Sequence, residues 1–114
     1  MTDKELLELA AKAAGLKLDG PSGRIVRRES DGQPVYWNPL TDDGDALRLA
    51  VKLGLAVSID SVEQETWAHH EQAFKGSSEK WKCCPTSNNG DEDGYAATRR
   101  AIVRAAAEIG RAMP

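Results

Sequence analysis

The segment Val35–Leu55 constrains the fold of this chain more than any other part of the sequence. Its first residues have strand character, and Asn38-Pro39 ends that strand. Asp42, or Thr41 before it, is placed to cap a helix, and Gly54 is placed to end it. Six apolar side chains recur between these ends at helical spacing: Ala46, Leu47, Leu49, Ala50, Val51 and Leu53. An apolar arc this wide predicts a helix largely buried against more than one neighbour.

Two more helices are predicted, one before this segment and one after it. Thr2 and Glu5 form a capping box, and Gly15 ends the helix that follows them. The last helix is expected to run over Asp93–Ile109 and to end at Gly110. Five segments have the residue types or the alternation of strands: Arg24–Arg27, Val35–Trp37, Leu55–Asp60, Thr66–His69 and Lys80–Cys83.

The order of these elements, α–β–β–α–β–β–β–α, predicts an α+β fold. In such a fold a small antiparallel sheet has helices packed on it. The 114 residues fit one domain, so we expect a single α+β domain over residues 1–114. Residues 61–92 are read as an irregular insert, with its two strands joined near Lys75–Ser78.

Composition and charge narrow the function classes. The net charge of −3 and the pI of about 5.4 disfavour nucleic-acid binding, which usually needs a basic surface. Apolar runs are too short to span a membrane, and the first residues lack the pattern of a secretion signal. We therefore expect a cytoplasmic protein. Cys83 and Cys84 are adjacent and are read as reduced thiols.

Acidic residues gather at the starts of two predicted helices. They are Asp42, Asp43 and Asp45 in one group, and Asp91, Glu92 and Asp93 in the other. Carboxylates of this kind could hold Mg²⁺ or Ca²⁺ if the two groups converge, with Asp42, Asp45, Asp91 and Asp93 as the candidates. Capping and the helix dipole explain the same residues without a metal. We adopt the capping interpretation and expect no metal, no cofactor and no catalytic residue.

Two pairs of adjacent residues, His69-His70 and Cys83-Cys84, are candidates for a zinc site or for a cysteine–histidine nucleophile pair. Structural zinc sites usually space their ligands two to five residues apart. Adjacent strand residues point to opposite faces, so each pair offers one convenient ligand at most. No sequence motif activates a cysteine nucleophile. Whether these four residues are functional is left open.

The last helix carries a line of basic side chains: Arg100, Arg104 and Arg111. At the helical rise this line is about 16 Å long. This line is either a solvated face or a docking strip for an acidic protein surface. Docking of nucleic acid on the same strip is the less favoured interpretation. Trp67 and Trp81 are core or core-edge candidates that would anchor an interface if exposed. These five residues are the predicted partner-binding candidates.

One stretch, Trp37–Ala46, resembles a signature of the phage ABA-sandwich domain family, small proteins of bacteriophages and prophages. There an aromatic-x-Pro-x-Thr-Asp sequence leads from a strand into a helix, as Trp37, Pro39, Thr41 and Asp42 do here. Ala97–Ala106 is similar to the terminal helix of these proteins. The resemblance implies a layered sandwich of sheet and helices and a phage origin. It implies no particular activity.

These observations favour a small phage-type accessory protein that binds another protein in the cytoplasm of a bacterial host. A host or defence component is the expected partner, which would make the protein an anti-defence inhibitor. One alternative is a divalent-metal-binding module or small hydrolytic enzyme built on the acidic helix starts. Another is nucleic-acid binding through the arginine-rich helix face. The sequence leaves the partner's identity and the oligomeric state open.

Overall fold

The computed structural model describes residues 2–16, 18–19, 24–28, 34–60, 62–70, 77–80 and 94–113. These residues form an α+β structure with three helices and antiparallel strands. In chain order the elements are α1 (Asp3–Ala14), β1 (Leu18–Asp19), β2 (Arg24–Arg28), β3 (Pro34–Tyr36), α2 (Asp43–Leu53), β4 (Ala56–Asp60), β5 (Glu65–His69), β6 (Ser77–Lys80) and α3 (Gly94–Ala112).

The ends of α1 and α2 are capped as their sequences predict. The Thr2 hydroxyl accepts a hydrogen bond from the backbone N–H of Glu5 at 3.2 Å. Asp42, rather than Thr41, caps α2 and accepts from the N–H of Asp45 at 2.8 Å. Both helices end at a glycine in the left-handed conformation. Local side-chain chemistry therefore sets three of these four helix ends at the predicted residue and the fourth at one of its two candidates.

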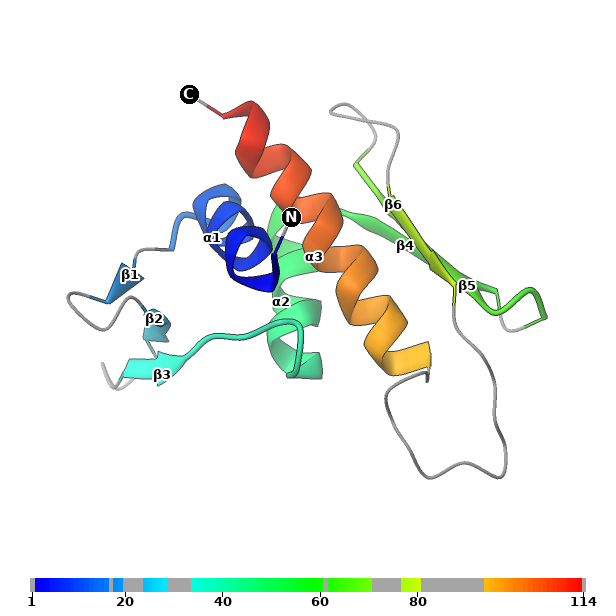
Figure 1. Ribbon diagram of the computed structural model, residues 1–114, viewed down its shortest axis with the longest axis horizontal. Coiled ribbons are helices and arrows are strands. Elements are labelled where there is room, and N and C mark those ends of the chain that lie inside the picture. Colours follow the sequence, from blue (N-terminus) through cyan, green and yellow to red (C-terminus); the bar gives the residue numbers. More distant parts are fainter. Residues whose placement is uncertain are drawn as a thin grey trace.

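The strands form two separate three-stranded groups, whereas the sequence pattern predicted one sheet. The groups have the orders β1-β2-β3 and β4-β5-β6, and every pairing in them is antiparallel. Figure 1 shows them on opposite sides of the helices. The chain turns at Asn38-Pro39 directly into α2, which carries it away from β3 before β4 begins. Strand β1 was not predicted, because two residues are too short for a recognisable alternation.

Strand β6 also corrects the sequence reading. It covers Ser77–Lys80, where a turn was expected, and so begins before the predicted strand Lys80–Cys83. Its register against β5 pairs Ala68 with Ser77 and Glu65 with Lys80. Serine favours turns, so the local sequence gave the opposite indication. Pairing with β5 overrides that preference. Residues 81–93, including Trp81 and both cysteines, lie outside the described residues.

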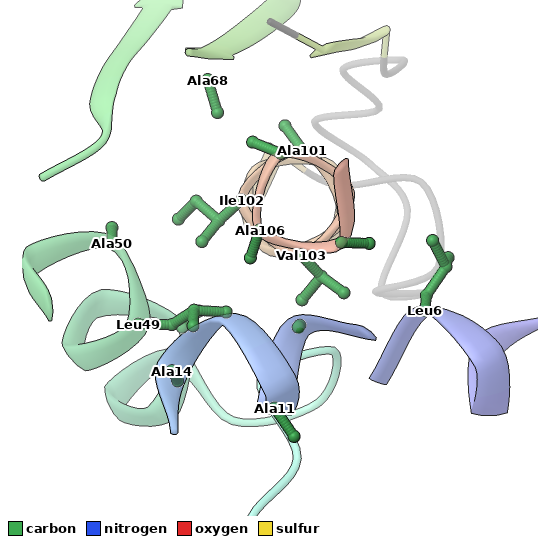
Figure 2. Close-up of a cluster of buried hydrophobic side chains, with 14 of the residues drawn as sticks. Leu6, Ala11, Ala14, Leu49, Ala50, Ala68, Ala101, Ile102, Val103 and Ala106 are labelled. Atoms are coloured by element: carbon green, nitrogen blue, oxygen red, sulfur yellow. The ribbon is translucent and has the colours of Figure 1, made fainter. Parts of the chain in front are cut away.

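The core is built mainly from small side chains at the contacts of α3. Of the sixteen buried hydrophobic residues that the structure describes, eleven are alanine. Figure 2 looks along α3, with Ala68 pointing at it from β5 and Val103 on the side of α1. Helices that meet through alanines can approach closely, and partly buried leucines pack around this core.

Helix α3 continues through Gly110, which was predicted to end it. Gly110 is buried, and a Cβ atom there would overlap the carbonyl oxygen of Leu9 and lie 2.8 Å from its carbon. The glycine therefore allows α1 and α3 to cross closely and does not cap a helix. No described helix has both the length and the apolar character needed to cross a membrane.

Candidate functional site

An open apolar groove of about 600 Å³ lies where α2, β4 and the first half of α3 meet. Leu47 and Ala50 of α2 contribute to one wall, and Val57 and Ile59 of β4 contribute to another. Tyr95, Thr98 and Ile102 of α3 line the floor between them, with Asp43, Ala46, Gly94 and Arg99 completing the lining. Figure 2 shows Ala50 and Ile102 pointing into the space between α2 and the sheet.

The β4 wall follows from the register of the sheet. Val57 pairs with Ala68 of β5, and Ile59 pairs with Thr66, so these four side chains share one face. Ala68 and Thr66 are fully buried. Helix α3 packs on β5 and β6 but not to the same extent on β4. Ile59 consequently remains 61% exposed, although the alternation of Leu55–Asp60 predicted a half-buried strand.

The α2 wall corrects the prediction of a largely buried helix. Its inner side buries Asp45, Ala46, Leu49 and Ala50, as a surface helix would. Leu47 and Val51, which belong to the same wide apolar arc, are 64% and 72% exposed. They lie one helical turn apart, so they form one exposed ridge on α2, and Leu47 of this ridge lines the groove. The second neighbour implied by the arc is not supplied by the described residues.

Polar groups at one end of the groove are engaged with each other. The Arg99 guanidinium donates to the Leu40 carbonyl oxygen at 2.8 Å and to Asp43 Oδ1 at 2.6 Å. The hydroxyls of Thr98 and Thr66 share a hydrogen bond of 2.9 Å. Among the described residues, the groove lining contains neither histidine nor cysteine. The described lining is therefore mainly apolar, and its hydrogen-bonded polar groups lie at one end.

The acidic start of α2 serves the fold. Asp45 is almost fully buried, and its carboxylate accepts from the backbone N–H of Asn38 at 3.0 Å and from Arg48 Nη2 at 2.8 Å. Asp42 accepts the capping bond described above. Within the described residues, no three His, Cys, Asp or Glu side chains gather as metal ligands would. Asp91 and Asp93 lie outside those residues, so the predicted convergence of the two acidic groups stays a prediction.

The three predicted docking arginines all have acidic partners within the chain. Arg100 reaches Asp3 of α1 at 3.3 Å, and Arg104 reaches Glu79 of β6 at 2.5 Å. Arg111 pairs with Glu108 one turn earlier in α3, at 3.1 Å. All three remain partly exposed. The first two therefore tie α3 to its neighbours on either side.

The remaining candidates lie away from the groove. Trp67 of β5 is 47% exposed on the outer face of the sheet, where its register partners are Ser58 and Ser78. Trp37, by contrast, is buried. His69 and His70 are half-buried at the end of β5. Trp81, Cys83 and Cys84 lie outside the described residues.

The groove residues were not among the predicted candidates. Leu47 was expected on a largely buried helix, and Val57 and Ile59 on the inner face of a half-buried strand, because hydrophobic periodicity predicts which side chains face inward. Periodicity does not reveal whether a neighbour covers them. The one available indication was the width of the arc on α2.

A comparison of this chain with family models, curated proteins and solved structures found no match.

Proposed function

We propose that this chain is a small phage-type accessory protein that binds another protein through the apolar groove and performs no chemistry of its own. The observation that carries this proposal is the exposure of large apolar side chains from three elements around one groove. Leu47, Ile59 and Tyr95 are each more than 60% exposed. Single exposed apolar residues are common, but a contiguous group of them marks an interaction surface.

The energetics favour a protein partner over a small polar ligand. Burying apolar surface contributes about 25 cal/mol per Å², so covering several half-exposed side chains offers several kcal/mol. Asp43, Thr98 and Arg99 of the groove lining are engaged in the hydrogen bonds described above, so few of its polar groups are left to orient a polar ligand. Strand β4 adds a backbone edge beside the apolar wall, and extended segments of partner proteins bind such edges.

The phage origin, the sandwich layering and a host or defence component as partner form the finer part of this proposal. They are supported by the resemblance of Trp37–Ala46 and Ala97–Ala106 to phage ABA-sandwich proteins. In the present structure, Trp37–Ala46 forms the turn that aims α2 at the groove. If the resemblance reflects ancestry, the signature preserves the element that supplies one wall of the binding surface.

The alternatives have less support. A metal-dependent enzyme would need Asp42 and Asp45, whose oxygens are engaged in capping α2 and in binding Asn38 and Arg48. Nucleic-acid binding would need Arg100 and Arg104 to exchange Asp3 and Glu79 for phosphates. Neither alternative accounts for the groove.

Affinity capture with matched variants tests the proposal. The tagged wild-type chain, Leu47→Lys and Val62→Lys are incubated with host-cell lysate, and the bound proteins are identified by mass spectrometry. Val62 is 87% exposed and lies outside the groove, so it controls for the added charge. We expect a specific protein that binds the wild type and Val62→Lys but is lost from Leu47→Lys. A partner that all three capture equally would contradict the proposed site.

A Trp67→Ser variant in the same experiment tests the outer sheet face, because Trp67 was predicted as an interface anchor. If the partner depends on Trp67 and not on Leu47, the binding surface is the outer face of β4–β6. If it depends on Leu47 alone, the binding surface is the groove.

A further inference from the structure

We propose that a second copy of this chain occupies the groove, with the two β4 strands paired antiparallel across a two-fold axis. The resulting sheet would have six strands, in the order β6-β5-β4-β4-β5-β6. This inference rests on the proposed function of the groove as a protein-binding surface, and it names a second copy, in place of a host component, as the occupant. It is carried by three properties: the edge of β4, the match of β4 to itself, and the ridge on α2.

Within the part of the chain that the structure describes, strand β4 is an edge strand without the features that usually protect one. Among the described strands it pairs only with β5, and all five of its residues are exposed. Natural proteins guard exposed edges with lysine, proline, bulges or a covering loop. The sequence of β4, Ala-Val-Ser-Ile-Asp, has no lysine and no proline, and its one charge is at the end. Such an edge is suited to pair with another strand.

The residues of β4 complement those of a second β4. An antiparallel pairing centred on Ser58 places Val57 opposite Ile59 of the second copy, and Ile59 opposite Val57 of the second copy. These pairs lie on the groove face, where cross-strand apolar pairs stabilise a sheet. The same register opposes Asp60 to Ala56, so no like charges face each other. A two-fold interface requires this kind of self-complementarity.

The ridge on α2 gives the paired strand something to cover. Val57 and Ile59 of the second copy would project from the extended sheet to the same side as this copy's Val57 and Ile59. Leu47 lies on that side as part of the groove lining, and with Val51 it forms the exposed half of the α2 arc. The pairing therefore supplies the second neighbour that the wide arc of α2 implies. An occupant of this groove should be an extended segment with alternating apolar residues and little charge, which describes β4 itself.

Size-exclusion chromatography with light scattering on the full chain tests the inference. The chain has a mass of 12.4 kDa, and we expect the wild type to show twice that mass at micromolar to millimolar concentration. Ile59→Lys would bring two charges to the interface, so we expect the monomer mass. Val62→Lys should remain a dimer, and far-UV circular dichroism should show that all three proteins are folded. A wild type with the monomer mass throughout would overturn the inference, as would an Ile59→Lys dimer.

Disulfide trapping tests the register. Ser58→Cys is made in a Cys83→Ser, Cys84→Ser background, which removes the native thiols. Residues directly opposite in an antiparallel pair have Cα atoms within disulfide reach. Oxidation should therefore link two Ser58→Cys copies, whereas Glu63→Cys in the same background should remain unlinked. Equal linking of both variants would overturn the pairing centred on Ser58.

The two proposals fail separately. A monomeric wild type whose lysate partner is lost on Leu47→Lys would overturn the second-copy inference and support the groove as a site for another protein. A dimer lost on Ile59→Lys, together with lysate capture that is the same for wild type and Leu47→Lys, would support the second copy and overturn binding of a host protein in the groove.

Discussion

At Gly110 the absence of a side chain sets how closely α1 and α3 can approach. Glycine to alanine in a helix interior ordinarily adds about 1 kcal/mol of stability. Here the added Cβ would overlap the backbone of Leu9, which cannot move without shifting α1. We expect Gly110→Ala to lower the free energy of unfolding by about 1–3 kcal/mol, measured by urea denaturation. Gly44→Ala is the matched control, because its nearest neighbour is the flexible end of Arg48 at 3.1 Å. A stabilised Gly110→Ala would contradict the close crossing.

Asp45 is the buried acid on which the turn before α2 depends. It binds the N–H of Asn38 and the guanidinium of Arg48, so an amide in its place loses a charge-assisted bond. We expect Asp45→Asn to lower the free energy of unfolding by about 1–3 kcal/mol. Asp43→Asn should cost less than about 1 kcal/mol, because the Asp43 side chain is largely exposed in its pair with Arg99. Equal losses in urea denaturation would mean that Asp45 has no special role.

At the scale of elements, what the sequence predicted depends on how local the cause is. The caps of α1 and α2 were predictable because Thr2, Asp42 and the terminal glycines act within a few residues. The position of β6 and the C-terminal end of α3 were not predictable from the local sequence. Pairing with β5 places β6, and the close contact with α1 explains why α3 continues through Gly110. Gly110 has the residue type of a helix end, and only the position of Leu9, far away in the sequence, gives it another role.

The contact between β5 and α3 contains a buried polar pair that can be measured. Thr66 is fully buried, and its hydroxyl shares a 2.9 Å hydrogen bond with that of Thr98. Thr66→Val or Thr98→Val leaves the other hydroxyl without this partner, which should cost about 1–3 kcal/mol. The double variant removes both polar groups and should be less destabilised than the sum of the single variants. Additive losses in a double-mutant cycle would show that the two hydroxyls are not coupled.

At the scale of the molecule, the candidate groove could not be predicted from hydrophobic periodicity. Periodicity shows on which face of a helix or strand a side chain lies, but it does not show whether another part of the fold packs over that face. The sequence identified Leu47, Val51, Val57 and Ile59 as apolar positions on amphipathic elements. Whether such positions are core or surface depends on how β4, α2 and α3 are placed in space. Most of the buried hydrophobic residues that the structure describes are alanines, whereas Leu47, Val51 and Ile59 are each more than 60% exposed.

Leu47 and Leu49 on the same helix test this division between core and groove. Leu49 is 2% exposed, so Leu49→Ala should cost about 2–5 kcal/mol at any protein concentration. Leu47 is mostly exposed in the single chain, so Leu47→Ala in dilute solution should change stability by less than about 1 kcal/mol. If a second copy covers Leu47, the Tm of the wild type must rise with protein concentration, because association stabilises the folded state by mass action. Leu47→Ala should reduce that rise and Leu49→Ala should retain it, as differential scanning calorimetry over a range of concentrations can establish. A wild-type Tm that does not depend on protein concentration would show that no second copy covers the α2 ridge. That result would contradict the paired sheet.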